Sequence, residues 1–255
     1  MVWSCLVSIL PGMAQTEKLT DYVNPFVGTD GYGNVYPGAQ IPFGGIQISP
    51  DTDSRFYDAA SGYKYNHLTL MGFSLTHLSG TGIPDLGDFL FIPGTGEMKL
   101  EPGTHEDPDQ GYRSRYSHDK EWASPNYYAV ELADYGVKAE MTSGVRSGMF
   151  RFTYPESDNA FIMIDMNHTL WQSCEWSNLR MINDSTITGY KLVKGWGPER
   201  HVYFTATFSK KLTGLRFVQD KKPVIYNTSR FRSSYEAWGK NLMACISFDT
   251  KAGEE

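Results

Sequence analysis

Residues 127–142, YYAVELADYGVKAEMT, consist of two runs in which apolar and polar side chains alternate, joined by a turn at 134–136. Alternation with a period of two is typical of a strand with one buried face, because successive side chains point to opposite sides. The stretch therefore predicts an antiparallel hairpin. Residues 148–155, GMFRFTYP, continue the pattern, with three aromatic side chains on one face and Arg151 on the other.

Further strand-like runs follow at short, regular spacing, at residues 160–166, 185–193, 201–209, 215–219, 222–227 and 241–249. Many short strands separated by turns predict an all-β fold of two packed antiparallel sheets, a β-sandwich. The composition agrees, since 25 Gly, 13 Pro and 14% aromatic residues suit strands and turns better than a helix bundle. We expect one brief helix, near residues 233–238.

The N-terminal third, from residue 21 to about residue 111, is rich in loops. A Gly or Pro every few residues leaves room only for short strands, such as one at 45–49. No repeat, low-complexity tract or linker divides the 255 residues, and this length suits a single large sandwich. We therefore expect shaped surface loops mounted on a sheet scaffold.

The charge and the hydropathy of the chain limit its partners. A net charge of −6 and a pI near 5.5 argue against a nucleic-acid groove, which needs a basic patch. No segment approaches the ~20 consecutive apolar residues of a membrane-spanning helix. An apolar run at 2–10 and small residues at 13–15 predict that residues 1–20 are an export signal or its remnant, with a buried first strand as the alternative.

Metal chemistry finds little support in the spacing of the polar residues. The six histidines show neither HxH nor HExxH spacing, which argues against a zinc site. Oxygens of Asp51, Asp53 and Asp58 could form a calcium site, but these residues lack EF-hand spacing. Turn capping is the commoner role of such aspartates.

Nucleophilic chemistry is also poorly supported. His77 and Ser79 are only two positions apart, which is an unfavourable geometry for a base and its nucleophile. The three cysteines, Cys5, Cys174 and Cys245, show no CxxC spacing. We expect free buried thiols, with a bridge between Cys174 and Cys245 as the alternative.

Residues 72–88, GFSLTHLSGTGIPDLGD, place two acids, Asp85 and Asp88, on one Gly-rich loop. Glycoside hydrolysis uses two carboxyl groups on opposite sides of a sugar, whereas acids three positions apart would approach it from one side. We therefore expect Asp88 to be a structural acceptor for loop amides.

Residues 56–67, FYDAASGYKYNH, interleave aromatic rings with polar side chains. The C–H face of a pyranose packs on an aromatic ring while its hydroxyl groups need hydrogen-bonding partners, so this composition suits a sugar site. The alternative for Tyr63 and Tyr65 is that they fill one face of a strand.

Three segments carry a family resemblance: VNPFVGTDGYGNVYPGAQIPFGGIQISPDT at 23–52, SGYKYNHLTLMGFSLTHLSGTGIPDLGDFLFIP at 61–93 and VYFTATFSK at 202–210. Together they resemble the N-terminal domain of glycoside hydrolase family 92, over residues 21–255. The resemblance implies a two-sheet sandwich of the galactose-mutarotase-like supersandwich type. Family members are calcium-dependent, exo-acting α-mannosidases that invert the anomeric configuration, mostly on α-1,2 linkages.

In complete family members, helices and an (α/α)6 barrel follow the sandwich, and the active site lies between the two domains. The general acid, the base and the calcium ligands come largely from the barrel. The resemblance therefore implies that this chain has no catalytic or metal-binding residues of its own, that the barrel domain is absent, and that the chain alone is inactive. It also implies a mannose-containing oligosaccharide and the barrel as partners, and a bacterial periplasmic or secreted location.

By position, the resemblance assigns substrate contacts to the turn at 31–36, the aromatic segment at 57–58 and the loop at 77–85. The residues assigned to the substrate pocket are Gly31, Asn34, Tyr57, Asp58, His77, Thr81, Gly82 and Asp85. Many relatives have Trp where Tyr57 stands, a departure that bears on linkage specificity more than on the fold.

Two other functions stay open from the residues alone: an autonomous carbohydrate-binding sandwich and a structural or partner-binding module. A face that docks a barrel would expose large aromatic side chains, whereas core tryptophans would be buried. The tryptophans that separate these cases are Trp171, Trp176, Trp196 and Trp238.

Overall fold

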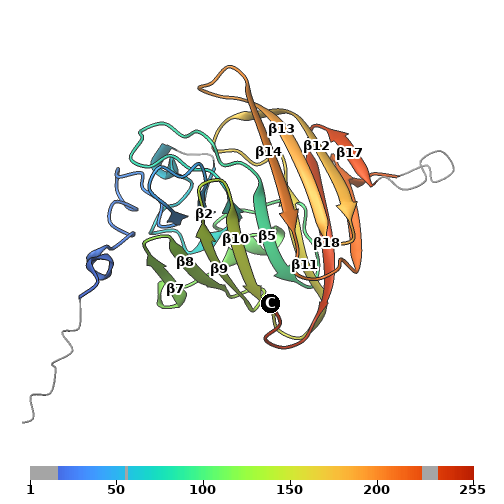
Figure 1. The fold of residues 1–255 in the computed structure, drawn as a ribbon, viewed down its shortest axis with the longest axis horizontal. Helices are drawn as coiled ribbons and strands as arrows, with labels where there is room; N and C mark the ends of the chain where they lie inside the picture. The colour runs from blue at the N-terminus through green and yellow to red at the C-terminus, as the bar shows by residue number, and fades with distance from the viewer. Residues whose placement is uncertain (1–16, 55–56, 226–234) are drawn as a thin grey trace, which may run out of the picture.

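The computed structural model describes residues 17–54, 57–225 and 235–255, without the side chain of Asp58. Its fold is the predicted β-sandwich (Figure 1). One layer is a sheet of eight strands, in spatial order β1 (Ala39–Gln40), β2 (Gln47–Asp51), β4 (Gly72–Ser74), β5 (Leu90–Thr95), β11 (Ser157–Asp165), β18 (Leu242–Thr250), β15 (Gly214–Gln219) and β16 (Lys222–Pro223).

The opposite layer consists of two sheets of four strands, drawn mainly in green and orange in Figure 1. The first sheet contains β10 (Gly148–Thr153), β9 (Val137–Ser143), β8 (Tyr127–Leu132) and β7 (Glu121–Ser124). The second contains β14 (Arg200–Thr207), β13 (Thr186–Lys194), β12 (Ser173–Asn183) and β17 (Glu236–Gly239). A separate small pair is formed by β3 (Thr69–Leu70) and β6 (Ser114–Arg115).

Helical structure in the described part of the chain is limited to single 3-10 turns: η1 (Leu19–Tyr22), η2 (Tyr57–Ala59), η3 (Pro108–Gln110) and η4 (His118–Lys120). None of the helices within the described ranges is long and apolar enough to cross a membrane. The short turns act as connections, because most of the buried apolar side chains belong to the strands.

Aromatic packing between the two layers forms the main core. Phe91 of β5 lies 5.1 Å, between ring centroids, from Phe150 of β10 and 6.0 Å from Phe204 of β14. One face of the eight-stranded sheet therefore packs on both four-stranded sheets. Its other face carries a second apolar cluster that includes Ile92 and Met163. Burial on both faces explains why β5, β11 and β18 are almost continuously apolar.

The predicted hairpin at 127–142 is confirmed as β8 and β9, with Leu132 paired with Val137 across the turn. The helix expected near residues 233–238 is wrong, because Glu236–Gly239 is the edge strand β17, paired with β12. Residues 233–234 lie outside the described ranges, as do residues 1–16, with most of the expected export signal, and residues 226–227.

The strand β12 was not anticipated from the sequence, although it spans 11 residues. Its inward positions include Cys174, Ser177 and Leu179, so small and polar residues hide the period-two pattern. Cys174 and Cys245 are both buried and free, which confirms the expectation of free thiols for these two and rules out the bridge between them.

Large aromatic side chains are exposed in the second four-stranded sheet and in the loops. Trp171, Trp176, Trp196 and Trp238 expose 57%, 47%, 68% and 58% of their surface. Trp176 and Trp238 alternate with buried residues of β12 and β17, so they lie on the outward face of that sheet. These four residues are therefore not core tryptophans.

Candidate functional site

Three connecting segments meet at one end of the sandwich: the loop 75–89 between β4 and β5, the loop 166–172 between β11 and β12, and the turn 195–199 between β13 and β14. Because Leu90 and Asp165 are partners in the antiparallel pair of β5 and β11, the loop that enters β5 lies beside the loop that leaves β11. We call these three segments the rim. Figure 1 shows the turn between β13 and β14 and the teal loops toward the same end of the molecule.

Hydrogen bonds join the three segments of the rim to one another. The amide of Gln172 accepts from Leu86 N at 3.2 Å and donates to Pro84 O at 3.3 Å. The carboxylate of Asp85 accepts from Leu86 N at 2.6 Å and from Trp196 N, in the turn, at 3.3 Å. Asp85 and Gln172 therefore fix the loop 75–89 against both other segments.

Glycine permits the close approach of these segments. Gly87 has a φ of +76°, and a Cβ atom there would lie 2.7 Å from Leu170 Cγ and 2.8 Å from Leu170 N. A Cβ atom at Gly195 would lie 2.5 Å from Gln172 Cγ. Both glycines are therefore required by the packing of the rim and not only by the local backbone.

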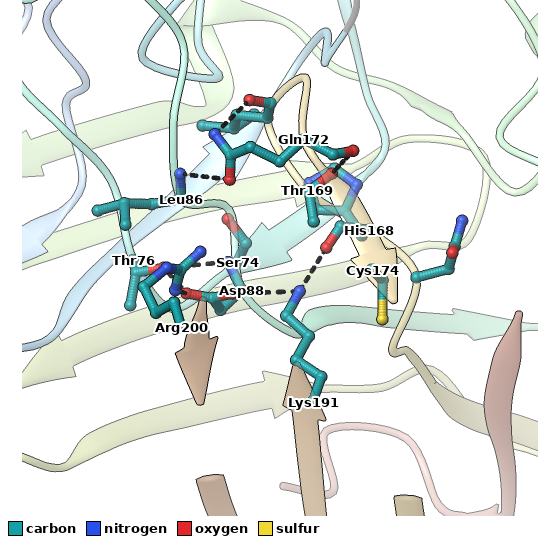
Figure 2. A network of polar contacts seen from close by, with 12 residues as sticks. Ser74, Thr76, Leu86, Asp88, His168, Thr169, Gln172, Cys174, Lys191 and Arg200 are labelled. Carbon is teal, nitrogen blue, oxygen red and sulfur yellow. Dashed lines mark hydrogen bonds and ion pairs between the residues drawn. The ribbon is translucent and has the colours of Figure 1, made fainter. Parts of the chain in front are cut away.

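A buried ionic network supports the rim from below (Figure 2). The fully buried carboxylate of Asp88 accepts from Thr76 Oγ1 at 2.8 Å, and its Oδ1 lies 3.2 Å from the Nζ of the fully buried Lys191. Arg200 donates to the other oxygen of Asp88. Lys191 also donates to the main-chain oxygen of His168 at 2.6 Å. The network thus connects β13 and β14 to the two loops.

The charge state of Asp88 follows from these contacts. Burial by itself would raise the pKa of the carboxyl group, but the Lys191 ammonium and the Arg200 guanidinium outweigh it and lower the pKa. Asp88 is therefore ionised and held by cationic side chains. The expectation of a structural acceptor was correct in kind, although the main donors are side chains and not loop amides.

A second buried cluster links β2 to both loops of the rim. Asp51 accepts from His77 Nε2 at 2.8 Å and from His168 Nε2 at 2.7 Å. The other nitrogen of His77 lies 2.7 Å from Gln47 O. His77 therefore lies between the Asp51 carboxylate and the main chain of β2. Burial raises the pKa of Asp51, but the imidazoles of His77 and His168 outweigh it and leave the pKa well below its ordinary value.

The turn at 28–36 packs beside the rim. Gly80 N donates to Asn34 O at 2.7 Å, and the ring of Tyr36 lies 5.1 Å from that of His77. The Nζ of Lys64 donates to Gly31 O and so holds the turn. Asn34 holds a φ of +49°, and its Oδ1 atom is buried without a hydrogen-bond partner among the described residues.

Exposed aromatic rings and a groove define the outer surface of this end. Tyr57 and Trp171, each 57% exposed, have ring centroids 5.5 Å apart at an interplanar angle of 52°. A groove of about 890 Å3 opens beside Trp171. Both apolar and polar residues line it, including Met71, Leu100, Asn167, Gln172, Ser173 and Asn241.

The structure brings most of the predicted site residues together. Gly31, Tyr57 and Gly82 are exposed, whereas His77 and Asp85 are buried and hold the loop through the contacts described above. Thr81 is half-buried and donates to Ile83 O at 3.0 Å. The side chain of Asp58 lies outside the described part of the chain.

Two earlier alternatives are settled by the contacts. Tyr63 and Tyr65 do not lie on a strand. Tyr63 is buried with its hydroxyl group bonded to Glu121, and Tyr65 stacks on His118 at a centroid distance of 3.9 Å. Both rings therefore serve packing in the interior and at its edge.

Sequence reasoning did not anticipate Trp171, Gln172, His168, Lys191 or Arg200 as parts of this site. One signal was present for Lys191, because the alternation of β13 places it on the inward face with Ile187 and Val193. A lysine at an inward strand position needs a buried acid as partner. No local pattern marked the others, which come from the loop 166–172 and from β14.

The acids of the site do not suit a calcium ion. Asp51 is bound by two imidazoles, Asp88 by an ammonium and a guanidinium, and Asp85 by two main-chain amides. No group of three or more His, Cys, Asp or Glu side chains within the described ranges could hold a metal ion. Calcium prefers six to eight oxygen ligands, which these engaged carboxylates do not offer.

Together, the fold and this site define a class: a β-sandwich domain whose loops present aromatic rings and hydrogen-bonding groups at one end. The glycosyl hydrolase family 92 N-terminal domain matches residues 22–255, and the chain belongs to this family. The resemblance seen in the sequence is thereby confirmed.

Two solved structures share the fold. The family GH92 glycosyl hydrolase ccman5 is 26% identical, with a TM-score of 0.73 over 90% of this chain and 30% of that chain. The family GH92 inverting mannosidase of Bacteroides thetaiotaomicron is 24% identical, with a TM-score of 0.74 over 94% of this chain and 31% of that chain. This chain therefore spans less than a third of the length of either protein.

A secreted glycosidase of Arthroderma benhamiae, described as uncharacterized, is 30% identical over 139 residues. The matched part is 54% of this chain and 17% of the fungal protein. The similarity thus extends to a fungal glycosidase, again over a minor part of its length.

Proposed function

We propose that this chain forms one wall of the substrate pocket of a secreted, exo-acting α-mannosidase. The complete enzyme is calcium-dependent, inverts the anomeric configuration and acts on α-1,2 linkages of mannose-containing glycans, in the bacterial periplasm or outside the cell. Its (α/α)6 barrel supplies the reacting acids and the calcium ligands. The chain described here binds sugar and does not cleave it.

The observation that carries this proposal is the rim itself. Two buried polar clusters, around Asp51 and Asp88, fix exposed loops and rings at one end of the sandwich. Binding sites of this kind need polar groups held in place by a rigid scaffold. The sugar-facing positions are Gly31, Asn34, Tyr57, Asp58, Thr81 and Gly82, with His77 and Asp85 as braces of the loop.

Hydrolysis requires a proton donor and a base that activates water, on opposite sides of the sugar. Asp88 is ionised between two cations and is a poor proton donor, while Asp85 is bound to the loop it supports. Each missing catalytic group typically lowers the rate by about 10²–10⁴. We therefore expect the chain alone to have no mannosidase activity.

The test is an assay of mannose release from α-1,2-mannobiose by the purified chain, with calcium, together with calorimetric titration by the same sugar. The expected result is weak binding without release. Calcium-dependent release of mannose would overturn the proposal that this chain lacks the reacting acids. Absence of any heat of binding at tens of millimolar sugar would overturn the proposed wall.

The second candidate is an autonomous carbohydrate-binding module. The pair of Tyr57 and Trp171 favours it, because both rings come from this chain and meet without a second domain. An autonomous module binds mannose oligosaccharides on the order of micromolar Kd by itself, whereas a single wall binds them on the order of millimolar. The calorimetric titration therefore separates the two functions.

A further inference from the structure

Trp171 has an unfavourable backbone conformation for its residue type. Its φ is +71°, in the left-handed region, where a bulky side chain is strained. The side chain is nevertheless 57% exposed, so burial of the indole does not explain the strain. Strain of this kind persists only where the surroundings impose it, and it concentrates at functional sites.

The surroundings do impose this conformation through both flanks of Trp171. Leu170 N donates to Leu86 O at 2.9 Å and Leu170 O accepts from Gln172 Nε2 at 3.1 Å. Thr169 Oγ1 donates to Gln172 O at 2.8 Å. Figure 2 shows the contact between Thr169 and Gln172 above the bond from Lys191 to His168 O. The loop is therefore held on each side of Trp171 while the indole itself projects outward.

The exposed indole does not stand alone. Tyr57 approaches it from η2, a segment 114 positions earlier, with ring centroids 5.5 Å apart. The groove of about 890 Å3 is lined by Trp171 together with Asn167, Gln172 and Ser173. The pair of exposed rings therefore adjoins, through Trp171, a groove with hydrogen-bonding side chains.

We propose that Trp171 is a specificity-determining residue, which forms with Tyr57 an aromatic platform for one pyranose ring of a bound mannose oligosaccharide. The adjacent groove receives the sugars that follow. This inference rests on the proposed function. It adds Trp171 as a residue that contacts the sugar, and it gives the direction in which the glycan extends from the platform.

The platform and the amide and hydroxyl side chains of the groove suit an oligosaccharide, and the groove is also lined by charged residues, Glu101, Asp165, Asp220, Lys221 and Lys240. The C–H face of a pyranose packs on the indole ring, and its hydroxyl groups meet amide and hydroxyl side chains such as Asn167 and Ser173. The preset loop lowers the ordering entropy that a flexible tryptophan would lose on binding.

Glycine at position 171 separates a role in binding from a role in packing. Glycine adopts positive φ without strain, so Trp171→Gly removes the ring and relieves the backbone together. Phe43→Gly is the matched control, because Phe43 is also exposed and has a φ of +60°, but it does not line the groove. Trp171→Phe retains an aromatic ring.

The experiment titrates the three variants and the wild-type chain with α-1,2-linked mannotriose by NMR and records their thermal midpoints. We expect Trp171→Gly to weaken binding by about fivefold or more with an equal or higher thermal midpoint. Phe43→Gly should change only the thermal midpoint, and Trp171→Phe should keep most of the affinity.

Wild-type affinity in Trp171→Gly would overturn the platform and leave the proposed function intact. A lower thermal midpoint in Trp171→Gly than in Phe43→Gly would show that the indole serves packing, and would also overturn the platform. If the wild-type chain shows no response to the sugar, the proposed function fails together with the inference.

Discussion

The buried ammonium of Lys191 donates to the main-chain oxygen of His168 at 2.6 Å, so a strand of the sandwich core is bonded directly to the loop that carries Trp171. The same ammonium lies 3.2 Å from Asp88, in the loop that enters β5. One cation therefore sets the position of two loops of the rim. The shape of the rim therefore depends on the buried charges of Lys191 and Asp88.

Replacement of Lys191 by Met should destabilise the fold. Asp88 would keep only Arg200 as a cationic partner, and breaking a buried pair on one side typically lowers the free energy of unfolding by about 3–5 kcal/mol. Chemical denaturation measures this loss. Lys194→Met, at an exposed position of the same strand, is the control and should change stability by less than about 0.5 kcal/mol. Equal stability of the two variants would contradict the role given to Lys191.

Asp51 should make stability depend on pH at the acid end. Its pKa in the folded state lies below the ordinary value of 3.8, because His77 and His168 outweigh the effect of burial. The folded chain therefore binds the proton less readily than the unfolded chain. The stabilisation is present above pH ~4 and is lost as the pH falls through the lower, folded-state pKa.

Comparison with Asp51→Asn measures this contribution. The difference in free energy of unfolding between wild type and variant should be about 3 kcal/mol near neutral pH and should shrink below pH ~4. The control is Asp249→Asn, at an exposed position. A difference between wild type and Asp51→Asn that stays constant from neutral to strongly acid pH would show that the imidazoles do not hold the charge of Asp51.

Gly87→Ala should disturb the rim without touching its exposed surface. The new methyl group would meet the backbone and side chain of Leu170 at less than 3 Å, at a position that also has positive φ. We expect a loss of about 1–3 kcal/mol in the free energy of unfolding. At Gly197, in the turn of the rim, a Cβ atom has no neighbour within 4 Å. Gly197→Ala should therefore be neutral, and a similar loss in both variants would contradict the packing described.

Calcium should have no effect on the chain by itself. The carboxylates of Asp51, Asp85 and Asp88 are engaged by other donors, so a calcium ion would have to displace buried partners. We expect the same thermal midpoint with calcium and with a chelator. A rise of several degrees with calcium would reveal a binding site within this chain, since a ligand stabilises the state that binds it.

The scaffold could be predicted from the sequence because its strands are marked by local alternation. Residues 148–155 place Phe150 and Phe152 on the inward side, as β10 has them. Prediction failed at β12 and β17, where small inward residues or the short edge position left no clear pattern. Pairing with neighbouring strands decides their structure, and this is a tertiary effect that a local pattern does not contain.

The candidate site was predictable only where its residues lie close together in the sequence. The loop that holds His77 and Asp85 was found in this way. His77, however, is a buried brace. Its partner Asp51 lies 26 positions away, and His168, which binds the same carboxylate, lies 91 positions away, beyond the reach of any local motif. The sequence singled out Trp171 only as one of four tryptophans whose exposure separates a docking face from a core. Its positive φ and its contact with Tyr57 are visible only in three dimensions.

The most direct test of the central claim is chemical-shift mapping of the isotope-labelled chain during titration with α-1,2-linked mannotriose. If the rim is the sugar-binding wall, the largest shifts will fall on the amides of residues 31–34 and 77–85 and on the indole of Trp171. Shifts concentrated instead on the outward face of β12 and β17, around Trp176 and Trp238, would contradict it.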